Sequence, residues 1–118
     1  MTELHRGLVI DVNLNPTKGS ETGKIRPCVI VTNDNYNRRV PVIQVVPVTE
    51  WSEKKGRIIT NVKLNPSGKN GLIKVSIADC LQTRPIDHGQ RMVRIRGEIE
   101  VVDMEAIDAA LKAVFSLR

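Results

Sequence analysis

The sequence contains few aromatic residues and no long apolar run. Aromatic side chains make up 3% of the 118 residues, with one Trp, one Tyr and one Phe. Modules that coat single strands or stack bases on an RRM-like sheet need more aromatic platforms than this, so the composition argues against them. No segment approaches the ~20 consecutive apolar residues of a membrane span, and the first residues, MTELHRG, include no apolar signal core. We therefore expect a cytoplasmic protein with no membrane association.

Cysteine and histidine are also scarce. Cys28 and Cys80 each lie within an apolar run, where cysteines are more often small buried hydrophobes than disulfide partners or metal ligands. His5 and His88 could form a catalytic pair, but one is close to the N-terminus and the other is in a turn-like segment, where solvated histidines are commoner. We expect no metal site and no cofactor.

The charge balance favours a polyanionic partner. Lys and Arg total 18 against 13 Asp and Glu, which gives a net charge of +5, and such an excess suits nucleic acid. A chain of this length predicts a single domain, residues 1–118. Two basic runs are either charged strand edges or contacts to a nucleic-acid backbone; they comprise Lys54, Lys55 and Arg57, and Arg91, Arg94 and Arg96.

Short β-rich segments dominate the pattern and alternate with turn signals. We predict strands over residues 8–14, 27–32, 40–49, 58–64, 73–81 and 92–99. The first should bury one face, and the second and third should form an antiparallel pair across the polar segment 33–39.

The end of the chain follows a helical period instead. Met104, Ile107, Leu111 and Val114 recur at helical spacing, and Asp103 is the predicted N-cap. Five or six strands followed by a helix predict a mainly β fold, a small SH3-like antiparallel β-barrel with a C-terminal α-helix.

Three segments contain residues suited to an anionic ligand. The first is Arg26, whose backbone is restricted by the following Pro27 and whose guanidinium can grip a phosphate. The second is the polar loop from Gly19 to Lys24, which lacks the Walker spacing and is either a ligand-binding loop or a plain hairpin connection. The third, residues 46–51, ends a strand with Thr49, Glu50 and Trp51; Trp51 could be a core residue, a rim residue or a stacking platform.

The order of these segments resembles that of the MazF/PemK/Kid toxins of bacterial toxin–antitoxin modules. The resemblance covers nearly the whole chain and rests on five pieces in sequence order, which are Arg6-Gly7, Gly19 to Glu21, Arg26-Pro27, Pro47 to Thr49, and Gln82 with Arg84. It implies a metal-independent, sequence-specific endoribonuclease that cleaves single-stranded mRNA, acts as a homodimer and is neutralised by a cognate antitoxin.

The resemblance also implies roles for individual residues. Arg26 and Thr49 match the residues that the family uses at the scissile phosphate, and Glu21 matches a loop carboxylate that handles substrate. The positions implied to bind RNA are Arg6, Gly19, Ser20, Gln82 and Arg84.

The chemistry of RNA cleavage is consistent with these roles. RNA supplies its own nucleophile, the 2′-hydroxyl, so the protein needs a base, an acid and charge stabilisation at phosphorus. Arg26 and Thr49 suit stabilisation. Glu21 could be the base, a positioning group or a hinge-side charge, and the acid stays open because the pKa of arginine lies above ~12.

Two other functions remain open at this point. The same fold could poison a protein target such as gyrase without cutting RNA. Alternatively, the chain could be a non-catalytic SH3-like RNA-binding module, which would bind RNA unspecifically and in a salt-sensitive way.

Overall fold

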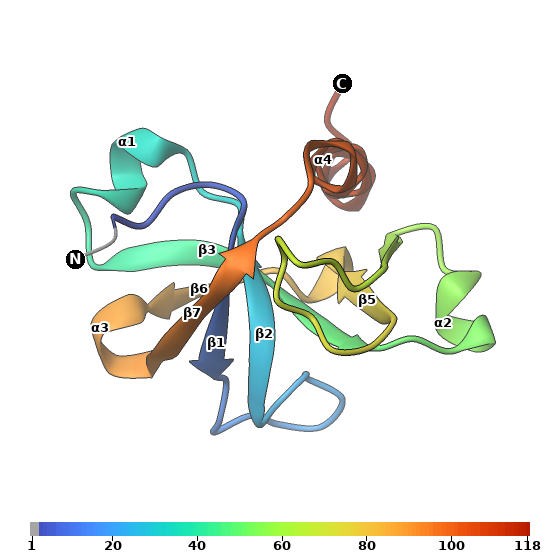
Figure 1. Ribbon diagram of the computed structural model, residues 1–118, viewed down its shortest axis with the longest axis horizontal. Coiled ribbons are helices and arrows are strands. Elements are labelled where there is room, and N and C mark those ends of the chain that lie inside the picture. The colour runs from blue at the N-terminus through green and yellow to red at the C-terminus, as the bar shows by residue number, and fades with distance from the viewer. Residues whose placement is uncertain (1–2) are drawn as a thin grey trace.

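The computed structural model describes residues 3–118 and shows a curved β-sheet with a long C-terminal helix (Figure 1). The strands are β1 (Leu8–Asn13), β2 (Ile25–Ile30), β3 (Val42–Glu50), β4 (Asn61–Leu64), β5 (Ser76–Asp79), β6 (Arg84–Asp87) and β7 (Met92–Glu98). The helices are α1 (Asp34–Asn37), α2 (Glu53–Gly56), the 3-10 turn η1 (Cys80–Gln82), α3 (His88–Arg91) and α4 (Val101–Phe115).

All strand pairings are antiparallel, and the sheet follows the order β4-β5-β3-β2-β1-β7. The long strand β3 pairs with β6 over its first half and with β5 at its end. This confirms the mainly β fold with a C-terminal helix and the predicted antiparallel pair. The barrel is not closed, because the path of paired strands runs from β4 to β7 without returning on itself.

Strand β1 is an interior strand of the sheet, between β2 and the edge strand β7, and it buries both faces rather than the one that its alternation predicts. Leu8 and Ile10 belong to one apolar cluster, while Val9 packs in a second cluster with Ile107 of α4. The polar residue Asp11 is also buried. A central strand covered on both sides has no solvent face for its alternate residues.

Several predicted strands are shorter than their apolar patterns. The 58–64 segment is extended only from Asn61. Ser52 caps the preceding helix α2 through a hydrogen bond from the Lys55 amide (3.2 Å), and the chain then turns before β4 begins. Strand β5 likewise gives way to η1 at Cys80. The pattern missed β6, which contains Pro85; proline is tolerated where the strand pairs along one edge only, as β6 does with β3.

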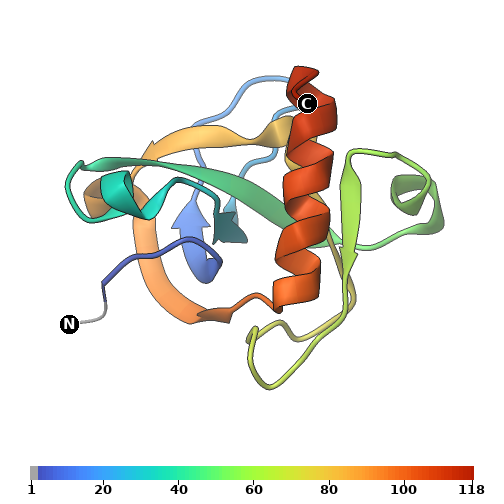
Figure 2. The ribbon, with the colours of Figure 1, turned by 90° about the horizontal axis from the view of Figure 1, so that it is seen from above.

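Helix α4 lies across the sheet beside β4 (Figure 2). Its N-cap is Glu100 and not the predicted Asp103, because the Glu100 carbonyl already accepts the first helical hydrogen bond, from the Met104 amide at 2.9 Å. Ile107 and Ala110 are the residues of α4 that are buried. Among residues 3–118, no helix combines the length and the apolar character needed to cross a membrane.

Both cysteines are free and buried, as the sequence predicts. Burial raises the pKa of both thiols, that of Cys80 to about 12. These cysteines therefore behave as small apolar core residues and not as nucleophiles.

Candidate active site

Arg26 and Thr49, which are 23 positions apart in the sequence, lie on two paired strands. Strand β2 pairs with β3 from Cys28 opposite Pro47 to Ile30 opposite Val45, and Arg26 and Thr49 each lie two residues beyond one end of this pairing. Both residues line one cleft of about 130 Å³. The Nε of Arg26 donates to the carbonyl of Gly23 (3.3 Å), which orients the guanidinium at the mouth of the β1–β2 loop.

The rest of the cleft lining includes charged residues that are not among the predicted catalytic or RNA-binding residues. Glu50 follows Thr49 on β3, Lys74 precedes β5, and Arg96 lies on β7. Lys74 and Glu50 form an exposed ion pair at 3.4 Å. Three cations therefore face one carboxylate, a balance that suits a polyanion. The full lining is Arg26, Pro27, Val48, Thr49, Glu50, Leu72, Ile73, Lys74, Ser76 and Arg96.

The segment that carries Leu72 and Lys74 is held by a fully buried asparagine, Asn70. Its Oδ1 accepts from the amides of Ser67 and Leu72, both at 3.0 Å, and its Nδ2 donates to the carbonyl of Asn65 at 2.9 Å. These bonds take the place of regular secondary structure over residues 65–72. The wall is consequently a fixed loop, although its sequence looks like an ordinary Asn-Pro-Ser-Gly turn.

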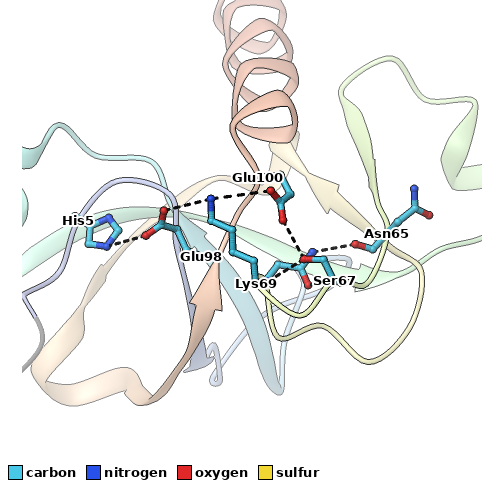
Figure 3. A network of polar contacts seen from close by, with 7 residues as sticks. His5, Asn65, Ser67, Lys69, Glu98 and Glu100 are labelled. Atoms are coloured by element: carbon cyan, nitrogen blue, oxygen red, sulfur yellow. Dashed lines mark hydrogen bonds and ion pairs between the residues drawn. The ribbon is translucent and has the colours of Figure 1, made fainter.

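A network of charges ties this loop to the start of α4 (Figure 3). Lys69 lies between Glu98 (3.7 Å) and Glu100 (4.0 Å), and Ser67 donates to Glu100 at 3.2 Å. His5 reaches the other side of Glu98 at 3.4 Å. The N-terminal segment, the loop and α4 therefore meet at the end of β7.

A buried carboxylate stands beneath the basic part of the cleft. The two oxygens of Asp11 accept from the Nε atoms of Arg94 and Arg96, each at 2.6 Å. The Asp11 side chain is 8% exposed, that of Arg96 15% and that of Arg94 61%. Arg96 also donates to the carbonyl of Gly71 at 2.7 Å. Arg96 is thus the inner member of the pair and the one that lines the cleft.

The loop between β1 and β2 is clamped by Gln82 of η1. The Gln82 side chain accepts from the Thr22 amide and donates to the Ser20 carbonyl, both at 3.2 Å. Arg84, on β6, donates to the carbonyl of Leu14 at 3.0 Å, where the loop begins. The structure therefore brings Gln82, Arg84 and Ser20 together, next to the strand end that carries Arg26.

The two glycines of this loop lie in different environments. Gly19 adopts a positive φ of 55° and has open space around it. A Cβ at Gly23 would lie 2.8 Å from side-chain oxygens of both Asn15 and Thr17, so another residue there would require these side chains to shift. The second positive φ of the loop, 67°, belongs to Lys24.

Glu21 is not brought into the cleft. Its carboxylate is exposed and accepts from the Lys18 amide at 2.7 Å, within the loop itself. The carboxylate that lines the cleft is Glu50. A catalytic role for Glu21 therefore requires the tip of the loop to turn toward the cleft.

Arg6 is separated from the other predicted site residues. It precedes β1, and the strand of six residues places it about 20 Å from the end that faces Arg26. Its guanidinium pairs with Asp108 of α4 and donates to the carbonyl of Val31 at 2.9 Å. The Arg6 amide donates to Asp34 at 2.6 Å, and this bond lowers the pKa of that carboxyl.

The histidines and the tryptophan also lie outside the cleft lining. His5 pairs with Glu98, and His88 begins helix α3, so the two do not form a catalytic pair in the described chain. Trp51 is half-buried, with the ammonium group of Lys63 at 4.9 Å from its ring centroid.

Comparison with known proteins gives a consistent result. Residues 5–115 match the model of the family described as PemK-like, MazF-like toxin of type II toxin–antitoxin system. The chain is 38% identical over 84 residues to the endoribonuclease MazF of Staphylococcus saprophyticus, covering 71% of this chain and 68% of that protein. It is 32% identical over 114 residues to the endoribonuclease MazF9 of Mycobacterium tuberculosis, covering 92% and 93%. The crystal structure of MazF from Deinococcus radiodurans has the same fold, with a TM-score of 0.83 at 20% identity, covering 99% of this chain and 100% of that one.

Proposed function

Since the chain belongs to the PemK-like and MazF-like toxins of type II toxin–antitoxin systems, we propose that it is an endoribonuclease that cuts single-stranded mRNA and so stops translation. Both relatives compared above carry the name endoribonuclease. The observation that carries the proposal is the meeting of Arg26 and Thr49 in one cationic cleft. An extended, unpaired strand suits such a cleft, because its backbone phosphates are accessible to side chains.

The reaction begins when the 2′-hydroxyl of one nucleotide attacks the adjacent phosphorus. A base removes the hydroxyl proton, a five-coordinate phosphorane forms, and the 5′-oxygen leaves with a proton, which produces a 2′,3′-cyclic phosphate and a 5′-hydroxyl. The guanidinium of Arg26 and the hydroxyl of Thr49 donate to the non-bridging oxygens, where negative charge accumulates. No protein nucleophile is needed.

The other predicted residues position the RNA and the loop. Gln82 and Arg84 hold the β1–β2 loop through its backbone, so Gly19 and Ser20 stand where a bound strand would pass. Glu21 is the proposed base, and it would reach the cleft when the tip of the loop turns toward it. Arg6 would contact RNA outside the cleft, beside α4.

The proposed partners are a second copy of the chain and a cognate antitoxin. Strand β7 ends the sheet and exposes Val93 and Ile95, which are 56% and 38% exposed; an edge of this kind is available for association. The family is named for toxin–antitoxin pairs. We place the protein in the cytoplasm, where its mRNA substrate is translated, and without a metal cofactor.

Cleavage of a long single-stranded RNA by purified protein in EDTA tests the proposal. We expect cuts at a recurring short sequence and ends that carry cyclic phosphate or 3′-phosphate opposite 5′-hydroxyl. Arg26→Ala should slow the cut by about 10²-fold or more, and Thr49→Ala by about tenfold or more, as for lost oxyanion donors.

A matched control removes the same charge elsewhere. Arg39 is exposed beyond α1 and outside the cleft, so Arg39→Ala should cut like the wild type. Equal rates for Arg26→Ala and Arg39→Ala would overturn the site assignment. Growth arrest by a wild-type protein that leaves RNA intact would instead favour a protein target, and salt-sensitive binding without either effect would favour an RNA-binding module.

A further inference from the structure

We propose that Arg96 forms a second phosphate subsite, which binds a backbone phosphate next to the scissile one. This inference rests on the proposed function, since it names a further contact to the same RNA strand. It starts from the fact that two guanidinium groups, Arg26 on β2 and Arg96 on β7, line one cleft. A chain of phosphates is a ligand that can occupy both at once.

Arg96 is built into the protein in a fixed orientation. Its Nε is held by Asp11 and its Nη1 by the carbonyl of Gly71, and its side chain is 15% exposed. The other terminal nitrogen, Nη2, has no hydrogen-bond partner among residues 3–118. A guanidinium that is already ordered loses little side-chain entropy when it binds a phosphate.

The charge of this cluster is not balanced within the protein. Asp11 supplies one negative charge, and it is shared by Arg94 and Arg96, so the three residues carry a net charge of +1. Neutralising Asp11 would need one arginine only. The surplus charge is partly directed to the cleft, because Arg96 lines it.

Arg94 provides a matched control within the same cluster. It makes the same 2.6 Å bond through the same atom type to the other oxygen of Asp11, but it is 61% exposed and does not line the cleft. If Arg96 only neutralises Asp11, Arg94→Gln and Arg96→Gln should affect RNA binding equally. If Arg96 binds a phosphate, only Arg96→Gln should weaken it.

The test measures the binding of a short single-stranded RNA that contains the cleaved sequence, mapped beforehand on long RNA. A 2′-deoxy nucleotide at the attacking position prevents cleavage, and fluorescence anisotropy gives the dissociation constant over a salt series. For Arg96→Gln we expect affinity to fall by about tenfold or more, as for a lost charge-assisted hydrogen bond. The slope of log K against log salt should decrease in size by about 0.7, the value of one phosphate contact on a single strand. Arg94→Gln should keep the wild-type slope.

A second measurement identifies the phosphate. Methylphosphonate groups, which are uncharged, replace the phosphates of the RNA one at a time. At one position beside the scissile phosphate, the wild type should lose about tenfold or more in affinity, whereas Arg96→Gln should lose little. In cleavage assays, Arg96→Gln should raise KM with little change in kcat, because the contact is the same before and during the reaction.

Several results would refute the subsite. The first is a wild-type affinity and salt slope for Arg96→Gln, and the second is an equal loss of affinity for Arg94→Gln and Arg96→Gln. The third is the absence of any phosphate position where the methylphosphonate weakens binding by the wild type more than binding by Arg96→Gln. Thermal melting shows whether each variant folds; if Arg96→Gln does not, Arg96→Lys keeps the charge, and it should keep the salt slope while losing affinity. RNA cleavage by the wild type together with any refuting result would remove the subsite and leave the proposed function intact.

Discussion

Replacing Gln82 by alanine tests whether this residue acts on the β1–β2 loop or directly on RNA. The side chain holds two backbone groups of the loop, the Thr22 amide and the Ser20 carbonyl. A hydrogen bond of this kind contributes about 0.5–1.5 kcal/mol net, so Gln82→Ala removes about 1–3 kcal/mol. The equilibrium constant for opening the loop should rise by about 5- to 150-fold.

Amide hydrogen exchange at Thr22 measures this directly, since its amide donates to Gln82. Exchange should accelerate by the same factor of about 5 to 150 when closing is fast. Cleavage should also slow, because a smaller share of molecules holds the loop closed. The loss in kcat/KM cannot exceed the rise in the opening constant, as only the closed fraction changes.

Gln82→Glu is an intermediate variant. An ionised carboxylate still accepts from the Thr22 amide but cannot donate to the Ser20 carbonyl, so its exchange rate should fall between those of the wild type and the alanine variant. Unchanged Thr22 exchange in Gln82→Ala would refute the clamp. A loss of cleavage larger than the gain in exchange would show that Gln82 also contacts RNA.

Three other perturbations have defined outcomes. Asp11→Ala should lower the free energy of unfolding by about 3 kcal/mol or more, because it leaves a mostly buried guanidinium unpaired; a urea titration measures this, and a loss below about 1 kcal/mol would contradict it. Asp34→Asn should destabilise the fold near neutral pH by about 1 kcal/mol, since it weakens the bond from the Arg6 amide. Because folding lowers the pKa of Asp34, that stability is present above the unfolded value of about 3.9 and is lost as the pH falls through the lower folded value; thermal melting should show the gap closing below about pH 4, and a constant gap would refute the cause. Glu21→Gln should slow cleavage by about 10²-fold or more if Glu21 is the base, whereas the same loss in Glu50→Gln would assign the role to the carboxylate that already lines the cleft.

The strand pattern could be predicted where a segment has a solvent face or a clear boundary. Apolar and charged residues alternate in the predicted strand 92–99, which the structure contains as β7, Met92–Glu98. The second and third predicted strands form an antiparallel pair, as expected. The prediction was wrong at β6, because Pro85 hides a strand that needs hydrogen bonds on one edge only. It was also wrong at the start of α4, since Glu100 and not Asp103 is the N-cap.

Residue types and their order were sufficient to select Arg26 and Thr49 and to identify the family. Composition also argued against a stacking module, and the apolar runs around Cys28 and Cys80 indicated that both cysteines belong to the core. These properties depend on the chemistry of single residues and on short motifs, which a sequence states directly.

Only the tertiary structure placed Glu50, Lys74 and Arg96 in the cleft, because they come from three segments that meet through the sheet register and the Asn70 loop. It also shows that Arg6 lies at the far end of β1 and that the exposed carboxylate of Glu21 bonds within its own loop. The reason is physical. The sequence shows which side chains are cationic or polar, whereas strand pairing and buried hydrogen bonds decide which of them line the same cleft.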